Sequence, residues 1–536
     1  MTLPQPSRTW CPVVLSLLVL TFVVRCISAY FYSWPGIQDA LYYKDVADHL
    51  VAGEGLTTRV LWNFDRIPES LVHPACAYWG PVVPCIIWSG YLIGGHHLEA
   101  AQGVMIFFGL VLLLQTLSLA RRITESVELA TAAGCLIAFN FQLNFFGVTT
   151  DTPIAFAVFA NGCLLAQAIA ICKKPHYLFL AAPFGVLSML TRADGVVLPV
   201  LTFVWGLLLV FRHRISVSAF LGLILFHLLI LAPWWARNAV TFGTPFPTAV
   251  TRSIAIREYS DLFRVHEQPS MDTFLAQGWR VIAHQKLRAF IDNLSTLVFG
   301  SQALLVLTLV VVIGPFLNDR LLWPYLLYFV LLFLTLSLLF SFQSQNGSLL
   351  HSLPALFPCF SVLAVTGVRR FFDRRAEGSL PGRNRRLFGI LSRIGPWLLV
   401  LYSGLMWAGS VRNLGRPAAQ AEGIKSTLTT WFDSEGSTRG LSLMSNDSLD
   451  MLAFLPYPVV QVPRDSGLDV IFEIARKYFV SYLVIIENQS LMVRPWDKPV
   501  YESSAGRLEF AANLDVDADT LGIHGIRIYR FFRKDD

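Results

Sequence analysis

Long apolar runs recur along the chain, and short segments between them carry most of its charge. A run of about 20 apolar residues crosses the hydrocarbon core of a bilayer as one helix. The pattern therefore predicts an α-helical polytopic membrane protein with about eleven transmembrane helices. The expected spans cover residues 11–32, 98–120, 128–148, 152–171, 177–191, 195–211, 216–236, 296–316, 321–341, 353–368 and 390–411.

The basic residues give the expected orientation, because Lys and Arg concentrate in cytoplasmic loops. With a cytoplasmic N-terminus, Arg121-Arg122, Lys173-Lys174 and a basic loop at 369–393 all fall inside. External loops then cover residues 33–95 and 237–294. We expect a multi-pass protein of the cell (plasma or inner) membrane.

The apolar segment from Tyr78 to Gly95 is interpreted differently. A full crossing there would move every later Arg cluster to the outside. We therefore expect a re-entrant or interfacial segment, which Pro81 and Pro84 also favour. The first apolar run is long for a signal peptide, so we expect an uncleaved helix.

Residues 415–536 differ in pattern from the transmembrane module at 1–414. Short apolar or alternating runs there predict strands, and one segment has helical periodicity. An odd number of crossings puts this region outside, as a small soluble, extracytoplasmic α/β domain. The expected strands are 441–444, 459–462, 482–486 and 526–531, and the expected helix is 468–479.

Composition agrees with a membrane protein: 54% of the residues are hydrophobic and 15% are charged, against about 25% charged in soluble domains. The Arg clusters lie between apolar runs, so no nucleic-acid partner is expected despite the net charge of +6. The sequence has no CxxC, HExxH, Walker A or GxGxxG motif. No cofactor is predicted, and a divalent metal has no support. Cys76 and Cys85 are candidates for a disulfide that spacing alone cannot establish.

Two carboxylates are candidate catalytic groups. Asp39 follows the first helix among aromatic residues, where it can take a proton from an acceptor hydroxyl or amine. Its alternative reading is a solvated loop carboxylate. Asp151 precedes Pro153 on the same expected membrane face, and its alternative reading is a helix N-cap.

Candidate donor-binding residues lie on the same face. Arg192 and Asp194 interrupt two apolar runs, either as part of a site or as a pair that pins a helical hairpin. Arg237 supplies a cation for a phosphate, unless it is an interfacial Arg whose side chain reaches toward water. His351 lies in a polar turn, either against a phosphate or sugar or as an ordinary loop histidine.

These motifs occur in an order that resembles the GT-C superfamily of polyprenyl-phosphate-sugar glycosyltransferases, which contains protein O-mannosyltransferases and the lipid A aminoarabinose transferase. The resemblance covers about residues 10–370. It rests on Asp39-Ala40-x-x-Tyr43, His73-Pro74, Tyr78-Trp79-x-Pro81, Asp151-x-Pro153, Arg192-x-Asp194-Gly195, Pro233-Trp234-x-x-Arg237-Asn238 and Gly347-Ser348-x-x-His351.

The resemblance implies inverting sugar transfer with Asp39 as the base, Asp151 as a second acid and arginines near the lipid phosphate. Tyr43, His73 and Trp79 are the further donor-binding candidates. Many relatives carry adjacent acids in the first loop, whereas Gln38 precedes Asp39 here, so metal binding is not implied.

The implied partners are a polyprenyl-phosphate-linked sugar, the lipid bilayer, and an acceptor that is a protein, a lipid or a glycan. Two other functions fit a polytopic chain: a lipid-linked sugar flippase or transporter, and a non-catalytic membrane scaffold. Transporters commonly contain inverted repeats. The sequence contains no visible repeat, and its candidate polar residues gather at one membrane interface.

Overall fold

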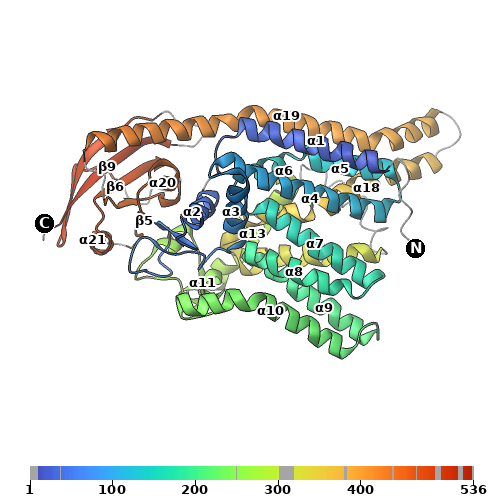
Figure 1. Ribbon diagram of the computed structural model, residues 1–536, viewed down its shortest axis with the longest axis horizontal. Helices are drawn as coiled ribbons and strands as arrows, with labels where there is room; N and C mark the ends of the chain where they lie inside the picture. The colour runs from blue at the N-terminus through green and yellow to red at the C-terminus, as the bar shows by residue number, and fades with distance from the viewer. Residues whose placement is uncertain are drawn as a thin grey trace.

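Helices make up most of the molecule, and a β-sheet domain lies at one end of the helical bundle (Figure 1). The computed structural model describes residues 10–36, 38–248, 250–300, 319–378, 383–436, 440–465, 467–488, 496–516 and 523–533. The chain begins at the far end of the bundle and ends in the sheet domain (Figure 1).

Eight helical segments within the described ranges are long and apolar enough to cross a membrane. They are built around α1 (Trp10–Phe31), α4 (Leu98–Thr124), α7 (Pro153–Cys172), α9 (Val197–Phe211), α10 (Val217–Phe242), α15 (Trp323–Leu334), α18 (Phe357–Glu377) and α19 (Arg383–Ser434).

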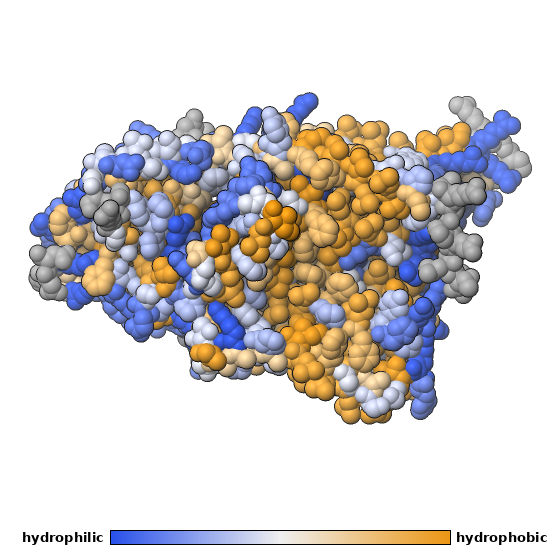
Figure 2. Space-filling view, viewed as in Figure 1, coloured by the Kyte–Doolittle hydropathy of each residue, from blue (hydrophilic) through white to orange (hydrophobic). Residues whose placement is uncertain are grey.

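Shorter apolar helices account for two more predicted spans: α5 (Val127–Phe139), followed by α6 (Phe141–Phe146), and α8 (Tyr177–Thr191). Most of the predicted span at 296–316 lies outside the described residues. Hydrophobic residues cover the visible side of the bundle between hydrophilic surfaces at its two ends (Figure 2). The chain is a multi-pass membrane protein, and the predicted fold class is confirmed.

Short helices and turns occupy the space between the bundle and the sheet domain (Figure 1). Among them, α3 covers most of the segment expected to be re-entrant, and its 13 residues span only about 20 Å. The short α-helices are α2 (Asp39–Val51), α3 (Val82–Gly94), α11 (Val250–Ala255), α12 (Met271–Leu275), α16 (Ser341–Gln345) and α17 (Ser348–Ser352), and α13 (Trp279–Gly300) is longer, with 22 residues. Single turns of other helix types are η1 (Ala193–Val196), η2 (Tyr259–Phe263), η3 (Arg320–Leu322), η4 (Thr335–Leu339) and η5 (Leu353–Leu356).

The C-terminal domain contains a mixed seven-stranded sheet in the order β2-β5-β4-β6-β9-β8-β7. The first four strands run parallel and the remaining pairs are antiparallel. All four predicted strands and the predicted helix are confirmed. The strands are β2 (Val60–Leu61), β4 (Leu443–Ser445), β5 (Val459–Gln461), β6 (Tyr482–Asn488), β7 (Val500–Ser503), β8 (Gly506–Leu514) and β9 (Ile523–Arg533), and the helices are α20 (Ser448–Phe454) and α21 (Leu468–Lys477).

Two features tie this domain to the rest of the chain. Strand β2 belongs to the first external loop and pairs with β5 in the register Val60 to Val459. The same loop forms a two-stranded sheet of β1 (Thr57–Thr58) and β3 (His73–Pro74). Helix α19 runs unbroken through residues 414 and 415 from the bundle to the sheet domain (Figure 1). The first loop and the C-terminal domain therefore form one packed unit.

Basic residues gather at the end of the bundle that is opposite the sheet domain. Arg121 lies over the ring of Trp10, 4.7 Å from its centroid, where α1 begins. Arg369 pairs with Glu128 at the start of α5, with 3.4 Å between nitrogen and oxygen. This arrangement supports the predicted orientation, which remains a prediction.

Candidate functional site

Asp39 is the first residue of α2, at the junction of the bundle and the sheet domain. The preceding residue, Gln38, has φ 43° and ψ −97°, in a region that non-glycine residues rarely occupy. The N–H of Gln38 donates a hydrogen bond to Oδ1 of Asp450 in α20, at 3.3 Å. The C-terminal domain therefore holds the backbone next to Asp39.

Asp151 lies beside the Asp39 segment because Thr150 ties the two loops together. The N–H of Thr150 donates to the carbonyl of Pro35 at 2.7 Å, and its hydroxyl donates to the carbonyl of Ala40 at 2.8 Å. Oδ1 of Asp151 accepts from the N–H of Thr152 at 2.5 Å. Thr152, not Asp151, is the N-cap of α7, so the N-cap reading does not describe Asp151.

Arg192 lies between α8 and η1 and holds several parts of the site. Its Nε contacts Oδ1 of Asp194 at 3.2 Å, and its Nη1 donates to the hydroxyl of Thr152 at 3.1 Å. Its Nη2 donates to the carbonyl of Ser348 at 3.5 Å. The predicted pair with Asp194 is present, and the same guanidinium reaches the residue that follows Asp151.

Close backbone packing fixes the end of α8 against the first external loop. A Cβ added at Gly80 would lie 1.8 Å from the carbonyl oxygen of Leu190, so only glycine fits there. His351 lies beside Asp151, with 3.9 Å between Nε2 and Oδ2, and its ring meets Phe146 edge to face. Asp39, Asp151, Arg192 and His351 thus come together from segments far apart in the sequence.

The electrostatic environment favours a protonated Asp39. Burial raises its pKa to about 7, the neighbouring Asp151 adds to the rise, and Arg192 opposes it. Burial, with Asp39 nearby, also raises the pKa of Tyr43 well above its usual value. A carboxyl group with a pKa near 7 exchanges protons efficiently at neutral pH.

Tyr43 and Trp79 belong to one aromatic cluster next to Asp39. Their ring centroids lie 5.9 Å apart, and Trp79 stacks on Trp62 with a centroid distance of 4.3 Å. Trp62 comes directly after β2, the strand that enters the C-terminal sheet. The cluster therefore links the candidate site to that domain.

Two predicted donor-binding residues have other partners. Nη2 of Arg237 donates to the carbonyls of Ala75 at 2.8 Å and Leu56 at 3.4 Å. Nδ1 of His73 lies 2.7 Å from the carbonyl oxygen of Leu71, and burial lowers the pKa of His73. Among the described residues, no hydrogen bond or ion pair joins either side chain to Asp39.

The C-terminal domain contributes residues to this region that the sequence pattern did not single out, above all Asp450 and Asp447 at the start of α20. Burial and the neighbouring Asp450 raise the pKa of Asp447 well above its usual value. The available signal was Asn446-Asp447 directly after a buried strand, a position where polar residues often form sites.

In the parts of the chain that the structure describes, no group of three metal-ligating side chains is arranged to hold a metal ion. All eight cysteines are free, including Cys76 and Cys85.

No family model matches the sequence, and no curated protein sequence matches it. Similar solved structures exist. ArnT from Cupriavidus metallidurans bound to undecaprenyl phosphate is 14% identical, with a TM-score of 0.58 over 96% of this chain and 97% of that chain. ArnT is the lipid A aminoarabinose transferase, a GT-C glycosyltransferase. The chain has the GT-C fold.

The apo state of the same ArnT gives a TM-score of 0.57 at 13% identity, over 96% of this chain and 97% of that chain. The archaeal oligosaccharyltransferase AglB from Archaeoglobus fulgidus gives 0.45 at 14% identity, over 88% of this chain and 69% of that chain. The GT-C fold of the ArnT structures extends over nearly the whole of both chains, so it includes the C-terminal domain as well as the bundle.

Proposed function

We propose that the chain is an inverting membrane glycosyltransferase that transfers a sugar from a polyprenyl-phosphate donor to an acceptor on the outer face of the cell membrane. The observation that carries this proposal is the convergence of Asp39, Asp151 and Arg192 between the bundle and the sheet domain. A base and a cation for the leaving phosphate are the two groups that such a transfer requires.

In the proposed reaction, the acceptor oxygen or nitrogen attacks the anomeric carbon from the side opposite the phosphate. Asp39 takes the acceptor proton while the bond from that carbon to the phosphate oxygen breaks. The polyprenyl phosphate leaves with the bonding electron pair, and Arg192 stabilises its negative charge. Asp151 and His351 lie next to these groups and orient them or the sugar.

Support for the donor class comes from two sources. The bundle has the lipid-exposed apolar surface that a polyprenyl chain needs beside its phosphate (Figure 2). ArnT, which shares the fold, was solved with undecaprenyl phosphate bound. On this proposal, residues 1–414 form the transferase module and residues 415–536 form an extracytoplasmic domain that completes the site.

The test is a transfer assay with the purified full-length protein in proteoliposomes. The donors are undecaprenyl-phosphate-linked hexoses, pentoses and aminopentoses, each assayed with peptide, lipid and glycan acceptors, and release of free undecaprenyl phosphate is measured. We expect release from at least one donor by the wild type and none from Asp39→Asn. Absence of release from the whole panel, or equal release by both proteins, would contradict the proposal.

A further inference from the structure

Arg25 is a fully buried cation of α1, one of the helices long enough to cross the membrane. Its exposed fraction is 0%, although an arginine side chain stays charged in proteins. A buried charge in a spanning helix is costly, and such residues commonly belong to functional sites. The proposed reaction gives Arg25 no role, so its surroundings were followed outward from the guanidinium.

The guanidinium of Arg25 occupies a space that two glycines leave open. A Cβ added at Gly109 of α4 would lie 2.4 Å from Cζ of Arg25, and the three atoms nearest to that Cβ all belong to Arg25. A Cβ added at Gly147, which directly follows α6, would lie 1.7 Å from Nη1 of the same arginine. A side chain at either position would therefore displace the guanidinium.

The hydrogen bond that Arg25 donates ends on α6. Its Nη1 donates to the carbonyl oxygen of Leu143 at 2.8 Å, and the N–H of Gly147 donates to the same oxygen at 2.9 Å. Basic side chains often bond the last carbonyls of a helix in this way. Within the described ranges, Nε and Nη2 of Arg25 have no hydrogen-bond partner. The bond to Leu143 is thus the polar contact through which Arg25 acts on its surroundings.

The short segment after α6 leads directly to Asp151. Gln102 of α4 donates to the carbonyl of Val148 in this segment at 2.9 Å. Thr150 then ties the segment to the loop that carries Asp39, through the two hydrogen bonds described above. A shift at the end of α6 would therefore move Asp151 relative to Asp39.

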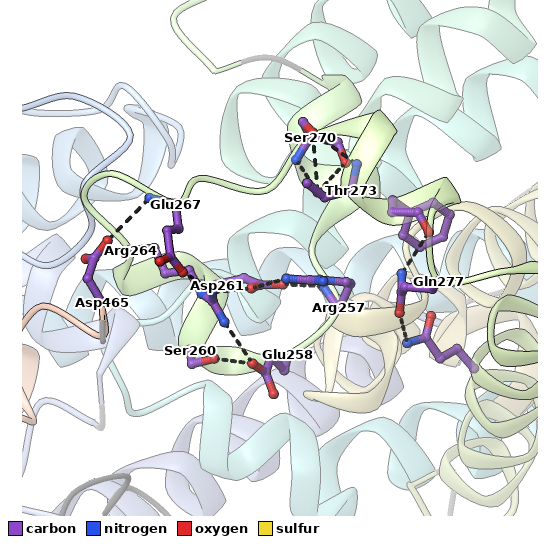
Figure 3. Close-up of polar contacts among 12 residues, drawn as sticks. Arg257, Glu258, Ser260, Asp261, Arg264, Glu267, Ser270, Thr273, Gln277 and Asp465 are labelled. Carbon is purple, nitrogen blue, oxygen red and sulfur yellow. Dashed lines mark hydrogen bonds and ion pairs between the residues drawn. The ribbon is translucent and has the colours of Figure 1, made fainter. Parts of the chain in front are cut away.

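The second external loop, by contrast, is held by its own ion pairs. Figure 3 shows the fully buried Asp261 of η2 paired with Arg257 and Arg264, each at 3.2 Å. Among the described residues, no ion pair involves α6 or the residues between it and Asp151. Hydrogen bonds and packing set the position of that segment, and the bond from Arg25 is its link to α1.

We propose that Arg25 is a positioning residue, which places Asp151 beside Asp39 through the end of α6. The glycine-lined space gives the guanidinium one position, so its bond to Leu143 fixes α6 against α1 and α4. This assignment rests on the proposed function, because it concerns the groups that surround the base of that reaction.

The experiment compares full-length variants in proteoliposomes. Arg25→Met keeps an unbranched side chain and removes the donor, so kcat should fall by up to about 100-fold, as a misplacement of about 1 Å can cause. Arg25→Lys keeps a charged donor and should restore part of this loss. Gly109→Ala should lower kcat in the wild type but not further in Arg25→Met, because the added methyl group meets Arg25. Gly103→Ala, also on α4, is the matched control, since a Cβ there meets nothing within 4 Å.

The pH dependence of kcat separates a positioning role from a merely structural one. Asp151 adds to the rise in the pKa of Asp39 to about 7. If Arg25→Met moves Asp151 away, the fall in kcat on the acid side should shift to lower pH, as we expect for Asp151→Asn, and the two changes combined should shift it no further. Loss of the positive charge alone would shift the fall to higher pH. A loss of folded protein would lower activity equally at every pH.

A second measurement, amide hydrogen exchange, needs no turnover. The N–H of Thr150 donates to the carbonyl of Pro35 at 2.7 Å. It should exchange about tenfold faster in Arg25→Met, the effect of one lost hydrogen bond to a charged group, and at the wild-type rate in Gly103→Ala. Should Arg25→Met not fold, Gly109→Ala displaces the same guanidinium and carries the same measurements.

Unchanged exchange at Thr150, or an acid-side fall in kcat at the wild-type pH, would overturn the inference. Wild-type turnover together with either result would leave the proposed function intact. If the wild type released no undecaprenyl phosphate but Arg25→Met exchanged faster at Thr150, the proposed function would fail and the contact between Arg25 and α6 would still hold the segment that carries Asp151.

Discussion

Oδ1 of Asp450 accepts a hydrogen bond from the backbone N–H of Gln38, although the two residues are 412 positions apart in the chain. Gln38 has a positive φ of 43°, a conformation that surrounding contacts must hold in place. Asp39 follows it as the first residue of α2. The contact therefore fixes where the proposed base lies relative to the bundle.

We predict that Asp450→Ala lowers kcat about tenfold, because a lost hydrogen bond to a charged group costs about 1.5–3 kcal/mol and part of that cost falls on Asp39. Asp450→Asn keeps an acceptor oxygen and should restore most of the activity. The measurement is kcat and donor KM for both variants at equal folded fraction. Equal defects in Asn and Ala would contradict a positioning role for this oxygen.

Asp39→Asn should abolish transfer in a protein that remains folded and still binds donor. The change keeps the volume of the side chain and removes the group that accepts the proton. Positioned general bases contribute about 10²–10⁴-fold, so the loss belongs in kcat. Asp48→Asn, on the same helix but ion-paired to Lys44, is the matched control. Turnover of Asp39→Asn within about threefold of wild type would exclude it as the base and make Asp151 the next candidate.

The pH dependence of kcat should report the pKa of Asp39, which burial and Asp151 raise to about 7. Only the ionised form accepts a proton, so activity should fall about tenfold per pH unit below 7. Asp151→Asn removes a neighbouring negative charge and should move this acid-side fall in kcat to lower pH. If the fall in kcat lay at the same pH in Asp151→Asn as in the wild type, another group would control the pH dependence.

The raised pKa of Asp39 also makes the stability of the folded protein depend on pH. The pKa of Asp39 is raised above its ordinary value of 3.8, so its contribution to stability is fully present below pH 3.8 and is lost as pH rises through about 7. Asp39→Asn should therefore have a Tm at pH 8 equal to or above that of the wild type. Thermal unfolding at pH 5 and pH 8 checks the sign.

Arg192 and Arg237 should differ when each is replaced. Arg192→Ala should raise donor KM, with a loss of about 1.5–3 kcal/mol, because it removes a positive charge that acts on Asp39. Arg237→Ala leaves the carbonyls of Ala75 and Leu56 without their donor, so a lower Tm should accompany any effect on the donor. The measurement is donor KM together with Tm for each variant. Unchanged donor affinity in both would place the phosphate elsewhere.

A reporter fused to the C-terminal end should be active only outside the cytoplasm. The basic residues at the far end of the bundle are the reason for this expectation. A matched fusion in the loop that carries Lys173 should be cytoplasmic. A cytoplasmic signal from the C-terminal fusion would invert the proposed orientation and remove the site from the outer face.

The sequence by itself determined most of the membrane-spanning helices and most of the C-terminal strands, and it singled out Asp39, Asp151 and Arg192 as candidates. A spanning helix is a local property, because about 20 consecutive residues must each tolerate hydrocarbon. A buried strand is likewise visible in a short apolar run. Charges at the ends of such runs are conspicuous, since burying them is costly without partners.

Only the tertiary structure decided how these parts meet. Strand β2 has two residues, too few for any period to show, and its place in the C-terminal sheet depends on pairing with β5. Arg237 carries the same charge in either role, and the carbonyls of Leu56 and Ala75 decide which partners it has. Asp450 and Tyr259 look like ordinary polar residues until packing brings them beside Gln38 and Asp447. Such contacts depend on how distant segments pack in space, and that information is absent from any local pattern of hydrophobic and polar residues.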